Sequence, residues 1–78
     1  MPRFFFDIDD GQPRERDEVG AELATLHDAC CEAVQLLPAL ARDVPCEDLP
    51  QCLAVDVRDE GGRSVVKVTL SLTVEHPA

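Results

Sequence analysis

Four cysteines and a histidine are the residues of this chain best suited to metal or redox chemistry. They are His27, Cys30, Cys31, Cys46 and Cys52. Adjacent side chains on a helix, such as Cys30 and Cys31, diverge by about 100° and do not easily share one ion, although His27, one turn earlier, could form a ligand pair with them. The spacing from Cys46 to Cys52 is wider than in typical zinc sites. These five residues are therefore only weak metal candidates, and the sequence predicts no metal and no other cofactor.

Acidic residues near the start of the chain resemble a calcium-binding loop. Residues 7–11 read Asp-Ile-Asp-Asp-Gly, and Glu18 follows. In the calcium loop the glycine occupies the sixth position and a helix precedes the loop. Here Gly11 is the fifth residue and a strand-like segment precedes it. The pattern therefore favours a tight hairpin turn over a calcium site.

A catalytic site would need a nucleophile, a base and a group that orients the base. The spacing of His27, His76, Ser64 and Ser71 links none of them to another, and the chain has no glycine-rich phosphate loop. The acidic residues of the last third fit a solvated strand end and turn; they are Asp56, Asp59 and Glu60. The sequence therefore predicts no catalytic residues and a protein that is not an enzyme.

The charge of the chain bears on its partners. The chain of 78 residues has sixteen acidic and seven basic residues and therefore a formal charge of −9. It contains no Trp or Tyr. Nucleic-acid binding depends on clustered Lys and Arg, so we expect no nucleic-acid partner. An acidic surface could suit a basic protein partner. A domain of this size has a marginal core, which favours self-association as a homodimer.

No apolar stretch is long enough for a membrane span or a secretory signal. We therefore expect no membrane association and a cytoplasmic location, where cysteines are normally reduced. A Cys46–Cys52 disulfide is an alternative that this compartment disfavours.

The first two thirds of the chain predict two strands and a helix. Alternating apolar residues predict a strand over residues 3–8. Residues 12–17 are expected to form at best a short edge strand, because Pro13 cannot donate a hydrogen bond to a neighbouring strand. Residues 20–23 read as a loop. Thr25 can cap a helix whose apolar stripe runs to Val44. Pro38 should kink this helix or split it in two.

The last third predicts a β-hairpin. Apolar residues alternate over 53–57 and 66–74, on either side of Asp-Glu-Gly-Gly at 59–62. The fold is therefore predicted to be a single α+β domain over residues 1–78, with a four-stranded antiparallel sheet in the order β-β-α-β-β along the chain and one helix on one face. The opposite face would be open and is a candidate dimer surface, formed by Phe5, Ala54, Val65, Lys67, Thr69 and Ser71.

Three segments of the sequence resemble a family of small bacterial proteins of unknown function. Residues 1–7 read Met-Pro-Arg-Phe-Phe-Phe-Asp, residues 17–23 read Asp-Glu-Val-Gly-Ala-Glu-Leu, and residues 57–63 read Val-Arg-Asp-Glu-Gly-Gly-Arg. The family typically has Tyr in place of Phe4. The resemblance, to proteobacterial proteins, implies a bacterial cytosolic domain and supplies no catalytic residues.

Three functions remain open at this point. The leading hypothesis is a non-enzymatic interaction or regulatory module that self-associates through the open sheet face or the edge of the final strand. The alternatives are a metal- or redox-responsive protein that uses the cysteines, and an antitoxin-like acidic partner of a basic protein.

Overall fold

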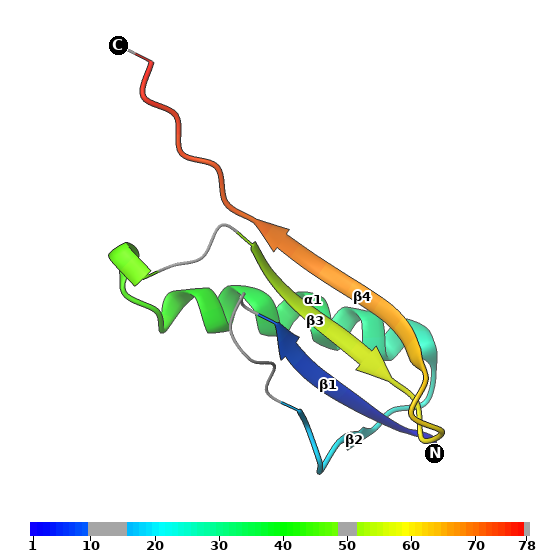
Figure 1. The fold of residues 1–78 in the computed structure, drawn as a ribbon. Coiled ribbons are helices and arrows are strands. Elements are labelled where there is room, and N and C mark those ends of the chain that lie inside the picture. Colours follow the sequence, from blue (N-terminus) through cyan, green and yellow to red (C-terminus); the bar gives the residue numbers. More distant parts are fainter. Residues whose placement is uncertain (10–15, 49–51, 78) are drawn as a thin grey trace.

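Four antiparallel strands form the sheet of this protein. The computed structural model describes residues 1–9, 16–48 and 52–77. The strands are β1 (Arg3–Asp9), β2 (Ala21–Glu22), β3 (Cys52–Arg58) and β4 (Ser64–Ser71), and they lie in the order β2-β1-β3-β4 (Figure 1). Every pairing is antiparallel. The predicted α+β class, with one helix and a four-stranded antiparallel sheet, is confirmed.

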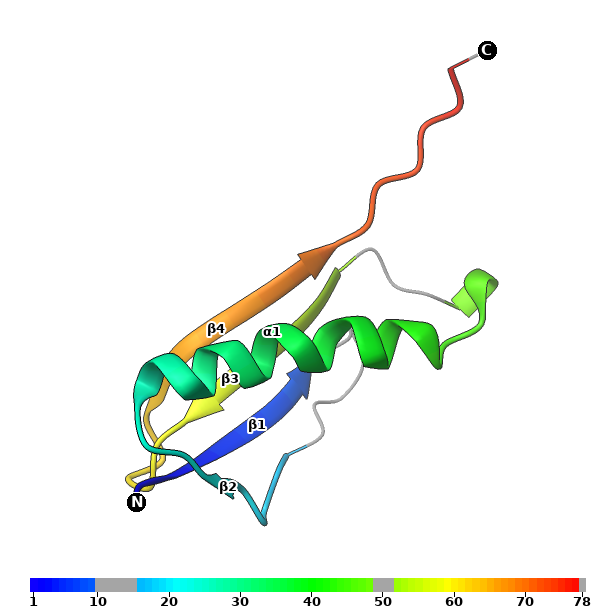
Figure 2. The same cartoon turned by 180° about the vertical axis from the view of Figure 1, so that it is seen from behind.

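A single helix, α1 (Leu26–Arg42), covers one face of the sheet and packs on β3 and β4 (Figure 2). It begins as the sequence predicted, because the Thr25 side chain accepts a hydrogen bond of 3.1 Å from the backbone N–H of Asp28. Three residues spaced by four, Ala29, Ala33 and Leu37, are buried against the sheet. Within the described residues, no helix has the length and apolar character that crossing a membrane requires.

Of the two alternatives predicted at Pro38, a kink or a division into two helices, the division is excluded, because α1 continues through Pro38 as one helix. Pro38 lacks the N–H that would bond to the carbonyl of Val34. Both residues are exposed, Val34 at 51 %. Water can therefore hydrogen-bond to this carbonyl, and the helix retains its tertiary packing on the opposite side.

The core lies between the helix and the sheet. It consists of Phe4, Ala29, Ala33, Leu37, Leu53, Val55 and Val57, with Phe6, Leu23, Leu36, Ala41, Val66 and Val68 packed against it. Because side chains alternate along a strand, these strand residues share the helix-facing side, and their neighbours along each strand lie on the other side.

The second strand of the sheet is not where the sequence placed it. Residues 12–15 of the predicted edge strand lie outside the described residues, and Arg16 and Asp17 belong to no strand. The strand is instead β2, in the segment predicted as a loop, where Ala21 pairs with Phe4 and Glu22 with Arg3. A two-residue strand has no periodicity that a sequence pattern could reveal.

The predicted hairpin is confirmed, with a shorter final strand. Asp59 builds the turn: its carboxylate accepts hydrogen bonds from the backbone N–H groups of Gly61 and Arg63. Gly62 adopts a φ of 82°, which favours glycine. β4 ends at Ser71, opposite the first residue of β3, Cys52, and not at Val74. Residues 72–77 continue beyond the sheet as an extended tail in line with β4 (Figure 1).

Candidate functional site

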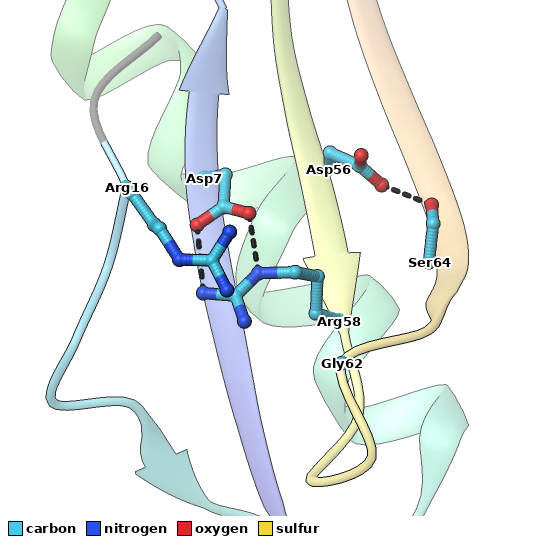
Figure 3. A pocket seen from close by; sticks show the side chains of 6 residues that line it. All are labelled: Asp7, Arg16, Asp56, Arg58, Gly62 and Ser64. Atoms are coloured by element: carbon cyan, nitrogen blue, oxygen red, sulfur yellow. Dashed lines mark hydrogen bonds and ion pairs between the residues drawn. The ribbon is translucent and has the colours of Figure 1, made fainter.

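A buried ion pair lies on the side of the sheet away from the helix. Asp7 of β1 is only 2 % exposed. Its carboxylate accepts two hydrogen bonds from Arg58 of β3, one of 2.5 Å from Nε and one of 3.1 Å from Nη2 (Figure 3). The Arg58 guanidinium also lies 5.0 Å from the centre of the Phe5 ring. Such a two-point contact adds geometric specificity to the energy of the ion pair.

Asp17 connects the loop before β2 to this ion pair. Its backbone N–H donates to Asp7 Oδ1 at 2.9 Å, and its carbonyl accepts a 2.8 Å bond from Arg58 Nη2. Its carboxylate accepts hydrogen bonds from the backbone N–H groups of Phe6, Val19 and Gly20. Gly20 has a φ of 71°, and a Cβ there would lie 2.8 Å from the carbonyl oxygen of Phe4. Glycine is therefore required where the loop passes β1.

The network changes the acidity of its members. Burial alone would raise the pKa of Asp7, but hydrogen bonds from Arg58 and Asp17 and the Arg58 charge outweigh it and hold the pKa below 3.8. Burial would also raise the pKa of Asp17, but the three backbone hydrogen bonds to its carboxylate outweigh this effect and lower the pKa. The hydrogen bond to Asp7 raises the pKa of Arg58. All three groups are therefore charged at neutral pH.

The ion pair borders a pocket of about 410 Å³. Its lining residues are Asp7, Arg16, Asp56, Arg58, Gly62 and Ser64 (Figure 3). Two carboxylates and two guanidinium groups give it no dominant charge. Ser64 donates a hydrogen bond to Asp56, but nucleophilic catalysis requires an oriented base as well, and neither histidine lines the pocket. The hydrogen bonds at this pocket join β1, β3 and the Asp17 loop.

The cysteines predicted as weak metal candidates are free thiols. Cys30 and Cys31 lie in α1, Cys46 in the short 3-10 helix η1 (Cys46–Asp48) and Cys52 at the start of β3. The Cys31 sulfur lies 3.6 Å from His27 Nε2, and the Cys52 sulfur lies 3.7 Å from Ser71 Oγ. Among the described residues, no three His, Cys, Asp or Glu side chains are grouped as a metal site would require. The possible calcium loop includes residues 10 and 11, which lie outside the described residues.

The candidate dimer surface on the open face is only partly exposed. Ala54 is 6 % exposed, and Phe5 is half-buried beside Arg58. The other four predicted residues, Val65, Lys67, Thr69 and Ser71, are exposed and all belong to β4. The accessible part of this predicted surface is therefore a single strand.

β4 lies at the end of the sheet, and no described strand pairs with its outer edge. Apolar side chains along this strand and its tail are accessible, with Val65 37 %, Leu70 39 %, Leu72 45 % and Val74 69 % exposed. The strand therefore presents both unpaired backbone groups and apolar side chains to solvent. We refer to β4 and the tail to His76 as the β4 edge.

The network of Asp7, Asp17 and Arg58 was not predicted from the sequence, where Asp7 was considered only as part of a possible calcium loop. Asp7 and Arg58 are 51 positions apart, so no local spacing joins them. One signal was available: these residues lie one in each of the three segments that carry the family resemblance. The structure brings the three segments together through this network.

One of the comparisons with known proteins identifies a family without a known function. Residues 3–71 match the family model described as "Domain of unknown function (DUF6894)". No curated protein and no solved structure matches the chain. The match covers both ends of the sheet and the whole helix. The chain therefore belongs to the DUF6894 family, a domain of unknown function.

Proposed function

We propose that this protein is a self-associating interaction module whose docking surface is the β4 edge and whose partner is a second copy of the chain. The observation that carries the proposal is the position of β4 at the end of the sheet, with Leu70, Leu72 and Val74 exposed. Unpaired N–H and C=O groups of an edge strand are a template for another strand. Apolar neighbours add a hydrophobic contribution to such pairing.

The β4 edge lacks most features that prevent strand pairing. Proteins usually protect an edge with charges, prolines or bulges. Between Ser64 and Val74 the only charged residue is Lys67, and the sequence there contains no proline. The irregular pairing lies at the first residues of β4, opposite Val57 and Arg58. The remainder of the strand is open to a partner.

The charge distribution favours the same surface. The chain carries a net charge of −9, yet none of its sixteen acidic residues lies between Ser64 and Val74. Two copies that meet along this edge keep every acidic residue except Glu75 of the tail away from the contact. Repulsion between more distant charges is screened over about 8 Å at physiological salt.

The open sheet face is less suited to self-association. It holds Asp7 and Arg58, which already satisfy one another, together with Asp56 and Lys67. Burying such charged groups against a second copy would cost desolvation energy without new partners. The edge requires no such burial.

The proposal is tested with Leu70→Lys, measured by sedimentation velocity over a range of concentrations. Leu70 is 39 % exposed, so burying the exposed part of its side chain on association contributes about 1 kcal/mol per copy. Loss of both contacts in a dimer amounts to about 2 kcal/mol, or about a 30-fold weaker association. The matched control is Val19→Lys, which adds the same charge at a side chain 76 % exposed in the loop before β2, at the other edge of the sheet.

Circular dichroism must show that both variants are folded. The proposal is contradicted if folded Leu70→Lys associates as wild type does, or if Val19→Lys weakens association equally.

A further inference from the structure

We propose that residues 72–76 act as an added strand on the second copy, pairing antiparallel with the β4 of that copy. This inference rests on the proposed function and specifies how the two copies meet. Leu72 and Val74 continue the apolar alternation of β4, but they lie past Ser71, where the described pairing with β3 ends. The tail extends away from the body in line with β4 (Figure 1), and the molecule is 52 Å long. A strand pattern that its own sheet does not pair indicates a partner strand.

The apolar pattern selects one register. In a symmetric antiparallel pair with Leu70 on the two-fold axis, Val68 lies opposite Leu72 of the second copy, and Val66 lies opposite Val74. All five apolar residues then face apolar residues on the same side of the joined sheet. A shift by one residue would put each of them on the face of its polar neighbours. A shift of the axis to Thr69 or Ser71 would leave one of the five without an apolar partner.

The few charges of the β4 edge agree with this register. Lys67 lies opposite Thr73 of the second copy, so the two lysines do not meet. Glu75 lies opposite Val65 and diagonally adjacent to Lys67 of the second copy, on the same face, within reach of a favourable contact. The symmetry makes this contact twice.

The ends of the strands also agree. Pro77 cannot donate a ladder hydrogen bond, so pairing would end at His76. In this register His76 lies opposite Ser64, the first residue of β4. The paired segment therefore ends at Ser64 of one copy and His76 of the other, the last residue before Pro77.

An isotope-filtered NOE experiment on a mixture of labelled and unlabelled full-length protein tests the register. In an extended strand Val68 and Leu72 are about 13 Å apart within one chain, too far for a contact. We expect NOEs between Val68 of one copy and Leu72 of the other, and between Val66 and Val74. Intermolecular NOEs in another register, or none from residues 72–76 in a sample shown to be dimeric, would overturn the inference.

Two tail variants separate this inference from the proposed function. Glu75→Lys makes the chain less negative, so general repulsion predicts tighter association, whereas loss of the contact with Lys67 predicts association about five-fold weaker at low salt. Val74 is 69 % exposed, so Val74→Lys, which removes its apolar contact from both copies, should weaken association about ten-fold or more. If Leu70→Lys disrupts the dimer while neither tail variant weakens it, the edge mediates association and the tail inference is wrong. If Leu70→Lys also has no effect, the proposed function itself fails.

Discussion

Asp7→Asn is the most informative test of the buried network. The substitution keeps the shape of the side chain but removes its charge and replaces one acceptor oxygen with a donor. Asp7 is 2 % exposed and accepts three hydrogen bonds, two from Arg58 and one from the backbone of Asp17. At least one of these donors would then face another donor in a site with little access to water.

The expected loss of stability is about 3 kcal/mol. A hydrogen bond to a charged group contributes about 1.5–3 kcal/mol, and breaking a buried pair by removing one partner costs about 3–5 kcal/mol. For a chain of this length, total stability is expected to be about 4–12 kcal/mol. The substitution should therefore remove a large share of it.

Urea unfolding followed by circular dichroism at fixed protein concentration measures this loss, since association would shift apparent stability. The matched control is Glu18→Gln, which removes the same charge from an exposed side chain next to Asp17 in the loop before β2. A difference between the two variants below about 1 kcal/mol would refute the view that Asp7 locks the fold.

Two further predictions concern the same region. The pKa values of Asp7 and Asp17 are lowered in the folded state, so their contribution to stability is complete above the unfolded value of 3.8 and is lost as the pH falls below it. Asp7→Asn should flatten this acid dependence of the unfolding free energy in urea titrations at several pH values. An unchanged slope would contradict the assignment. Gly20→Ala should destabilise the fold more than Gly62→Ala. Both glycines have positive φ, but only at Gly20 would the new Cβ meet a backbone oxygen, at 2.8 Å. Thermal melts that rank the two variants the other way would refute this explanation.

Much of the fold could be predicted from local pattern. The alternation of the final third indicated β3 and β4, and Thr25 marked the helix start. These signals are local, since each depends on residues within a few positions. Pro38 left a division of the helix open, because its penalty depends on surroundings that the sequence does not show. On the solvent side of α1, water can replace the missing hydrogen bond.

The candidate site was less accessible to sequence reasoning. The Asp7–Arg58 pair forms across strands far apart in sequence, so only the register of β1 against β3 makes it visible. The burial of Ala54 on the face expected to be open could not be foreseen from its strand alone. In contrast, the final strand's edge was one of the two surfaces that the sequence suggested for self-association, and the exposure of Leu70 and Leu72 distinguishes it from the other.

Sedimentation equilibrium of the wild-type protein in reducing buffer decides whether two copies associate as the exposed β4 edge predicts. Reductant excludes association through disulfides of the free cysteines. We expect a reversible monomer–dimer equilibrium that is weakened by Leu70→Lys. A wild-type protein that stays monomeric at every concentration up to the millimolar range would contradict this prediction.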